Sequence, residues 1–221
     1  MQFRALRSVL AGLAVACALV VAPAAFAATI WAFNLPATAL ASQNPPYPTV
    51  ATLTLTQTAD GVQFLLDPNE ASPGFSDASF IERLDYVYSG VELDSSDFRQ
   101  DGGAPGEFSF EDNPNNMDAG YKANDFHIVV DFPSKNDPDR FEPGDTSTWT
   151  VLGATLADFT NTFATANSKP SPINGVISVS SYSLPGVNPT PSNWVNGVPE
   201  PHLAVLLGIG LAALYARRRR S

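Results

Sequence analysis

The sequence predicts an all-β protein, an antiparallel β-sandwich preceded by a signal peptide and followed by a single transmembrane helix. Three observations lead to this prediction. Between residues 28 and 197, apolar residues recur mainly at the two-residue spacing of half-buried strands. The segments between these runs are rich in Pro, Gly, Asn and Asp, as turns are. Only one interior segment, 155–166, has apolar residues at helical spacing.

Residues 1–27 have the three parts of a secretory signal peptide. Arg4 and Arg7 give a positive start, residues 9–21 are apolar, and small residues precede the cleavage point. The residues that define this point are Ala25, Ala27 and Ala28. We therefore expect export by the Sec translocon and removal of residues 1–27 by signal peptidase. A retained N-terminal membrane helix is the alternative.

Cys17 is the only cysteine of the chain. As a lipoprotein acceptor it is a weak candidate, because the apolar residues that follow it differ from the polar linker of lipoproteins. Removal of the signal peptide leaves a domain without a disulfide, a thiolate nucleophile or a Cys ligand for zinc. The exported domain must therefore be stabilised by a packed core, for which its length suffices.

The body, residues 28–183, is predicted to be the sandwich domain. Residues 50–57 alternate apolar residues with threonine, and Asp60-Gly61 joins them to a second alternating run as a hairpin turn does. The segments predicted as strands are 29–35, 50–57, 62–66, 80–88, 126–132, 148–153 and 175–183. Their topology stays open between jelly-roll and immunoglobulin-like forms. Residues 184–197 are predicted to be a linker, because Pro, Gly and Asn recur there too closely for a strand or helix.

The charge of the exported segment limits its partners. Residues 28–197 contain six basic and 21 acidic side chains, a net charge of about −15. Such a domain repels phosphate groups, so nucleic acid is not expected as a partner. A soluble acidic surface, divalent cations or cationic partners remain as interpretations.

Residues 198–221 form the most informative segment. Residues 203–216 are uncharged and span about 21 Å as a helix, against about 30 Å for a bilayer core. Composition alone therefore also allows a buried core helix. Two features favour a membrane helix: prolines that break any preceding helix, and a terminal basic cluster that fits the cytoplasmic side. The basic cluster is Arg217, Arg218, Arg219 and Arg220.

The ordered combination of Val198-Pro199-Glu200-Pro201, a short apolar helix with Gly-x-Gly and a terminal arginine cluster resembles the PEP-CTERM sorting signal of Gram-negative bacteria. That signal is also catalogued as an ice-binding-protein C-terminal domain. The resemblance covers about 24 residues. It implies that an exosortase-type membrane enzyme recognises Pro199, Glu200 and Pro201, that residues 203–216 are a temporary anchor and that the arginines are the membrane stop. An unprocessed tail anchor is the alternative.

Catalytic groups are scarce in the exported domain. Its one histidine, His127, alternates with apolar residues of a predicted strand, so its side chain is expected to point outward into solvent. The sequence has no Gly-x-Ser-x-Gly or Ser-x-x-Lys motif, and we expect no enzymatic activity. Glycoside hydrolysis remains an alternative, since it needs only two suitably spaced carboxylates.

No cofactor is predicted, although calcium is an alternative because three acidic loops offer oxygen ligands. Two of these loops contain Asp94, Asp97 and Asp101, and Asp112, Asn113, Asn116 and Asp118. The third contains the four weak metal candidates, Asp137, Asp139, Glu142 and Asp145. None of the loops has the EF-hand spacing.

We expect a protein exported across the inner membrane to the cell surface or extracellular matrix. By resemblance, its role would be structural or adhesive in a bacterium that makes exopolysaccharide and biofilm. A carbohydrate-binding module, with or without calcium, is the first alternative, and a small glycoside hydrolase is the second. Carbohydrate binding would use exposed aromatic rings, for which Trp31, Tyr88 and Trp149 are candidates.

Overall fold

The structure is a computed structural model that describes residues 28–36, 49–72, 75, 78–112, 117, 121–123, 126–133, 137–165, 172–181 and 192–199. The strands up to the middle of the chain are β1 (Ala28–Pro36), β2 (Ala51–Gln57), β3 (Gly61–Pro68), β4 (Phe80–Tyr88), β5 (Phe98–Gly103) and β6 (Glu107–Glu111). The later strands are β7 (Lys122–Ala123), β8 (Phe126–Asp131), β9 (Ser147–Leu152), β10 (Ala164–Thr165), β11 (Gly175–Ser180) and β12 (Ser192–Pro199). The helical turns are η1 (Ser95–Asp97) and α2 (Ala157–Thr160).

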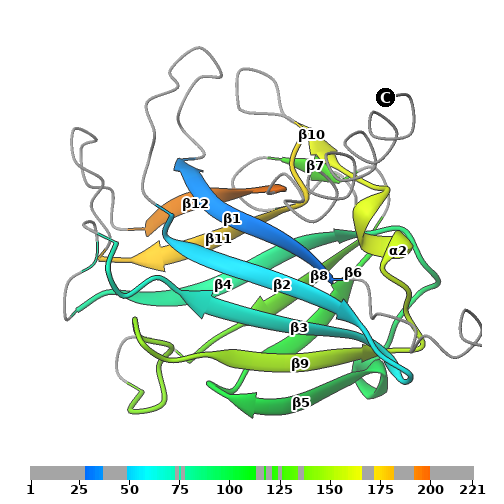
Figure 1. Ribbon diagram of the computed structural model, residues 1–221, viewed down its shortest axis with the longest axis horizontal. Helices are drawn as coiled ribbons and strands as arrows, with labels where there is room; N and C mark the ends of the chain where they lie inside the picture. Colours follow the sequence, from blue (N-terminus) through cyan, green and yellow to red (C-terminus); the bar gives the residue numbers. More distant parts are fainter. Residues whose placement is uncertain are drawn as a thin grey trace, which may run out of the picture.

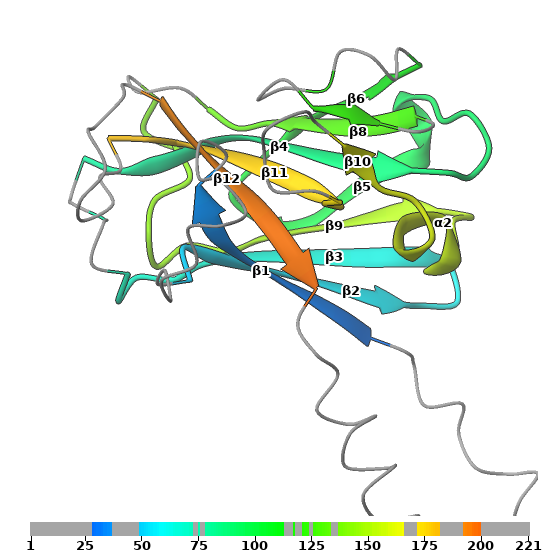
Figure 2. The same ribbon diagram turned by 90° about the horizontal axis from the view of Figure 1, so that it is seen from above.

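Ten strands form one antiparallel sheet in the order β5-β9-β3-β2-β1-β12-β11-β4-β8-β6. The predicted antiparallel all-β class is therefore confirmed. The sheet curves until it is nearly closed (Figure 1, Figure 2). Its two edge strands, β5 and β6, meet on the inside through the stacked rings of Phe98 and Phe108, whose centroids lie 5.3 Å apart.

The core fills the space that the curved sheet encloses. In β2, buried Leu53 and Leu55 alternate with half-buried threonines, as the sequence pattern predicts. The ring of Phe64 lies at the centre, 5.2 Å from the ring of Trp149 and 5.9 Å from that of Tyr86. Trp149 comes from β9 and Tyr86 from β4, so aromatic packing joins the two halves of the sheet.

The predicted helix 155–166 is much shorter in the structure, where α2 is a single turn. Phe159 is its one buried residue, and its ring lies 4.9 Å from that of Phe64 and 5.1 Å from that of Tyr88. The turn therefore packs its aromatic side chain against the end of the core. Burial raises the pKa of Tyr88 to about 12, and the nearby carboxylates of Asp158 and Asp97 add to this effect.

The linker prediction for residues 184–197 is wrong for its last part. Residues 192–199 form β12, which pairs with β1 on one side and β11 on the other. Val195 and Asn196 are fully buried. The folded domain thus extends to Pro199 and does not end at residue 183.

The sequence analysis also missed β5 and β6, which lie in a region rich in Gly, Pro and Asp. Both are sheet edges, and their outward residues are exposed. Edge strands need fewer apolar residues than central ones, so the alternating pattern is weak there.

A second, smaller hydrophobic cluster lies on the outer face of β4 and β11. It comprises Val87, Met117, Tyr121, Ala164, Ile173 and Val176, with the partly buried Trp194 packed against it. The two-stranded sheet of β7 and β10 carries part of this cluster. The outer face of the main sheet is therefore covered here instead of facing solvent.

Substitution of Gly197 by alanine tests the packing of β12. A Cβ atom at this position would lie 2.9 Å from Cε1 of the buried Phe33 ring, so we expect the free energy of unfolding to fall by about 1–3 kcal/mol. Gly102→Ala is the matched control, because no atom lies within 4 Å of a Cβ there. Denaturant unfolding of both variants measures the difference. Equal midpoints would contradict the packing of β12 against Phe33.

Candidate functional site

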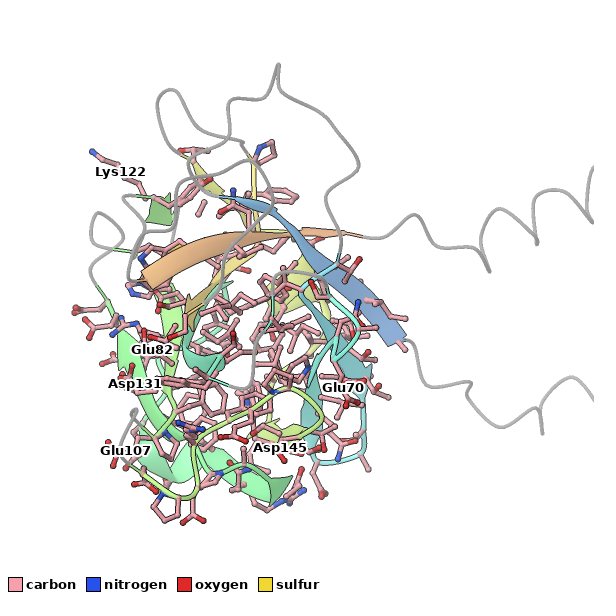
Figure 3. The ribbon with its side chains drawn as sticks, turned by 90° about the vertical axis from the view of Figure 1, so that its left-hand side faces the viewer. Glu70, Glu82, Glu107, Lys122, Asp131 and Asp145 are labelled. Carbon is pink, nitrogen blue, oxygen red and sulfur yellow. The ribbon has the colours of Figure 1, made fainter. Side chains whose placement is uncertain are left out.

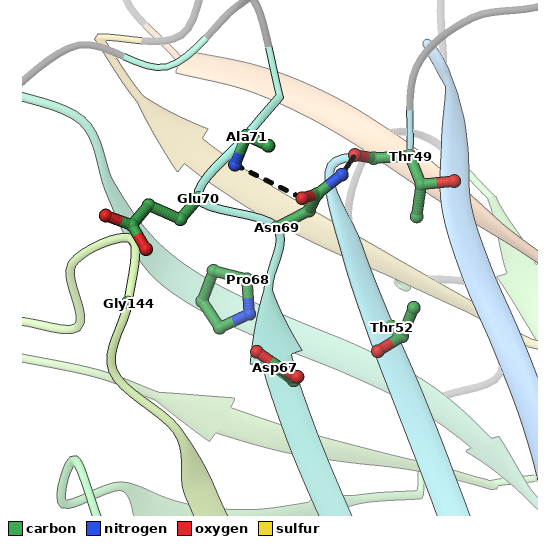
Figure 4. Close-up of a pocket in the computed structure, with 8 residues that line it drawn as sticks. All are labelled: Thr49, Thr52, Asp67, Pro68, Asn69, Glu70, Ala71 and Gly144. Carbon is green, nitrogen blue, oxygen red and sulfur yellow. Dashed lines mark hydrogen bonds between the residues drawn. The ribbon is translucent and has the colours of Figure 1, made fainter.

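A groove lies where β2 begins and β3 ends. Its largest hollow has a volume of about 880 Å³ (Figure 4). The lining residues are mainly polar: Thr49, Thr52, Asp67, Pro68, Asn69, Glu70, Ala71 and Gly144. The groove therefore offers hydroxyl, amide and carboxylate groups to a ligand.

Asn69 fixes the wall of this hollow. Its Nδ2 donates a hydrogen bond to the carbonyl oxygen of Thr49 at 2.8 Å, and its Oδ1 accepts one from the backbone N–H of Ala71 at 3.2 Å (Figure 4). Its own backbone N–H donates to the carbonyl oxygen of Val50 at 2.7 Å. One side chain thus ties the segment after β3 to the segment before β2.

Two carboxylates, Asp67 and Glu70, are exposed in this hollow. Neither makes a hydrogen bond or ion pair with its side chain among the described residues. Gly144 lies opposite Glu70, where a Cβ would be 3.8 Å from the Glu70 carboxyl carbon. With φ +96°, Gly144 also has a backbone conformation that favours glycine.

Two further hollows continue the groove around this end of the sheet. The second, of about 440 Å³, shares Gly144 with the first, and the third, of about 360 Å³, shares Pro105 and Asp139 with the second. Together the three are lined by seven carboxylates: Asp67, Glu70, Glu107, Asp131, Asp137, Asp139 and Asp145. Arg140 is the one basic side chain in this lining, and it pairs with Glu142. We call this chain of hollows the acidic groove.

The four weak metal candidates do not converge on one point. Asp137 Oδ1 accepts the backbone N–H of Asp139 at 2.9 Å, and Asp145 Oδ2 accepts that of Glu142 at 3.0 Å. Glu142 pairs with Arg140. Across the described residues, no three acidic, His or Cys side chains are grouped as metal ligands.

The loop with Asp94, Asp97 and Asp101 also uses its carboxylates within the fold. At the start of η1, Asp94 Oδ1 accepts the backbone N–H of Ser96 at 2.7 Å, and Asp97 Oδ2 accepts the backbone N–H of Asp94 at 2.8 Å. Asp101 joins Arg99 and Thr150 on the sheet surface. In the loop that contains Asp112, only Asp112 belongs to the described residues, since Asn113, Asn116 and Asp118 lie outside them.

The prediction that His127 points into solvent is wrong. Only 1% of the residue is exposed. Its cross-strand neighbour, Val87, belongs to the second hydrophobic cluster on the outer face. The side chain alternates with inward residues as expected, but this part of the outer face is covered.

The aromatic residues considered for sugar stacking are also buried. Trp31, Tyr88 and Trp149 are each 1% exposed and belong to the core. Trp31 Nε1 donates to Asn174 Oδ1 at 3.1 Å. Because all three rings are buried, they do not form an exposed sugar-stacking platform. Phe132 is the one aromatic residue in the lining of the acidic groove.

Two residues of the predicted processing sites, Ala28 and Pro199, belong to the described part of the chain. Ala28 is the first residue of β1, and Pro199, the last residue of β12, pairs with Trp31. The other predicted processing residues lie outside the described residues: Ala25, Ala27, Glu200, Pro201, the helix 203–216 and Arg217 to Arg220. Among the residues that the structure does describe, no helix is sufficiently long and apolar to cross a membrane.

Comparison with protein families, curated proteins and solved structures found no match to this chain.

A charged network on the outer face of β5, β9 and β3 is the best-defined electrostatic feature. Burial by itself raises the pKa of Asp101, but hydrogen bonds from Thr150 at 2.6 Å, Arg99 at 2.8 Å and Gln63 at 3.3 Å outweigh it. The pKa of Asp101 is therefore lowered. Arg99 also pairs with Asp60 at 3.3 Å, and both partners raise the pKa of its guanidinium.

Asp101→Asn is expected to lower the free energy of unfolding at pH 7 by about 0.5–1 kcal/mol, the size of a partly exposed ion pair. Because the folded-state pKa is lowered, the ionised carboxylate stabilises the fold above its unfolded pKa of about 4, and this contribution is lost as the pH falls. The difference between wild type and variant should therefore shrink below about pH 4. Denaturant unfolding at several pH values measures it, with exposed Glu92→Gln as the control. A difference independent of pH would contradict the role of the charge.

Proposed function

We propose that this protein is exported and sorted to the cell surface or extracellular matrix through its C-terminal segment, where it has a structural or adhesive role. The N-terminal signal-peptide pattern and the resemblance of residues 198–221 to a PEP-CTERM signal support export and sorting. In this proposal an exosortase-type enzyme acts on Pro199, Glu200 and Pro201, and residues 203–216 anchor the chain until then.

We further propose that the nearly closed sheet is a flattened sandwich. One layer would be β5-β9-β3-β2-β1, and the other β12-β11-β4-β8-β6. Ring contacts between Phe64 and Tyr86 at 5.9 Å and between Phe108 and Trp149 at 5.9 Å cross from one layer to the other. Such a rigid, disulfide-free domain suits a structural component outside the cell.

The acidic groove is the observation that carries the adhesive role. Its three hollows adjoin one another, so its shape suits an extended polymer better than a small molecule. Asp67 and Glu70 are exposed and make no side-chain hydrogen bond or ion pair within the described part of the chain. They are therefore free to bind amine or hydroxyl groups of a polymer.

Carbohydrate binding is the second candidate function, and the lining of the first hollow favours it. Thr49, Thr52 and Asn69 contribute groups that exchange hydrogen bonds with sugar hydroxyls. Because the groove has little aromatic surface, recognition would depend on hydrogen bonds and charge. A polysaccharide with amino groups would use both.

Binding of full-length protein to polysaccharides tests this proposal. We expect the tightest binding to a cationic polysaccharide such as chitosan, weaker binding to neutral dextran and none to anionic alginate, because the groove carries seven carboxylates. The double variant Asp67→Asn/Glu70→Gln should weaken chitosan binding about tenfold, equivalent to about 1.4 kcal/mol. Isothermal titration calorimetry measures the affinities.

The control is Glu92→Gln/Asp112→Asn, which removes two exposed carboxylates away from the groove. It should keep wild-type affinity. Equal weakening by both double variants would show that net charge, and not the groove, determines binding. Absence of binding to every polysaccharide would contradict the adhesive role.

A further inference from the structure

Both ends of the described domain belong to the middle of the sheet. β1 and β12 are the fifth and sixth of its ten strands, and they lie on the opposite side of the domain from the edge strand β5 (Figure 1). The residue pairs Trp31–Pro199 and Ala32–Val198 hold the last residues of β12 against β1. The predicted anchor therefore follows directly from the centre of the sheet.

The same central strands contain no charged residue. β2, β1, β12 and β11 are adjacent and have neither acidic nor basic side chains. Of the other six strands of the sheet, β3, β4, β5, β6 and β8 each contain at least one carboxylate, and β9 has no charged residue. Exposed Ile30 adds an apolar side chain to the uncharged strands, with 39% of its surface accessible. The second hydrophobic cluster covers the outer face of β11 and packs against Trp194 of β12. We therefore call the outer surface of β1 and β2 the uncharged face.

Basic side chains are also unevenly distributed. Arg83, Arg99 and Arg140 pair with carboxylates. Lys122 is exposed and makes no ion pair among the residues that the structure describes. Figure 3 shows it on the side of β12, apart from the labelled carboxylates. These labelled carboxylates are Glu70, Glu82, Glu107, Asp131 and Asp145.

The reach of the tail limits the orientation of an anchored domain. Three residues separate Pro199 from Leu203, the first residue of the predicted anchor, and the four steps between these two residues span at most about 14 Å. From β12 to the edge strand β6 there are four inter-strand spacings, about 19 Å along the curved sheet. The tail is therefore too short to turn the edge strands toward the membrane.

We infer that the anchored domain rests on the membrane through its uncharged face, with Lys122 toward anionic lipid headgroups and the edge strands facing away. This inference depends on the proposed function, since it takes residues 203–216 as the anchor. An anionic lipid surface repels the carboxylates of the flanking strands and attracts Lys122. The acidic edge strands are then accessible to an extracellular polymer while the chain is still anchored.

Fluorescence energy transfer to the membrane tests the orientation. The chain from Ala28 has no cysteine, so a single introduced cysteine can be labelled uniquely. The protein is purified after signal-peptide removal, checked by mass for an intact C-terminus, and reconstituted in vesicles of phosphatidylethanolamine and phosphatidylglycerol with an acceptor dye on the headgroups. The matched variants are Ile30→Cys on β1 and Ser109→Cys on β6, both exposed on strands of one sheet.

We expect transfer from residue 30 to be at least about twofold more efficient than from residue 109, since five strand spacings separate β1 from β6. Lys122→Glu should reduce this ratio. Equal transfer from the two positions, or stronger transfer from residue 109, would overturn the orientation. An unchanged ratio in Lys122→Glu would overturn the role of Lys122. Protein that fails to float with the vesicles would instead contradict the anchor, and with it the proposed function.

Discussion

The pairing of β1 with β12 is the constraint on which the rest of the structure depends. It joins the first and last described strands at the centre of the sheet, and without it the ten strands would separate into two groups of five. The aromatic core needs both groups, because Phe64 and Trp149 come from one and Tyr86 from the other. Residues 192–199 therefore belong to the folded domain.

The distribution of charged residues over the sheet follows the order of its strands. The central strands are flanked by strands on both sides and carry only uncharged residues, whereas carboxylates gather on the flanking strands and on the segments that line the acidic groove. Several of these carboxylates serve the fold itself: Asp137 and Asp145 accept backbone N–H groups in turns, and Asp101 accepts hydrogen bonds from Thr150 and Arg99. Asp67 and Glu70 have no such role among the described residues. Some acidic residues therefore stabilise the fold, and others line a surface suited to cationic or hydroxylated polymers.

The sequence was informative where burial on one face leaves a local pattern. Alternation in β2 and the Asp60-Gly61 turn predicted the first hairpin, and β4 was predicted within its observed bounds. β12 was missed because its Asn and Gly residues resemble a linker, while its burial comes from β1 and β11, which are distant in sequence. His127 was misplaced because the second hydrophobic cluster, which covers its face, is assembled from residues 87 to 176. The acidic groove could not be predicted, since it combines segments after β3, before β9 and around β6 that only the fold brings together.

Hydrogen–deuterium exchange of the backbone amides of residues 195–197, which pair with both β1 and β11, tests the central position of β12 most directly. Strands bonded on both sides exchange only on global unfolding, so these amides should be protected as strongly as those of β2 and β4. The backbone N–H group of Glu70, in the exposed segment after β3, provides the fast reference within the same protein. Exchange of β12 at the rate of this reference would contradict the account, because residues 192–199 would then behave as the linker that their composition suggests.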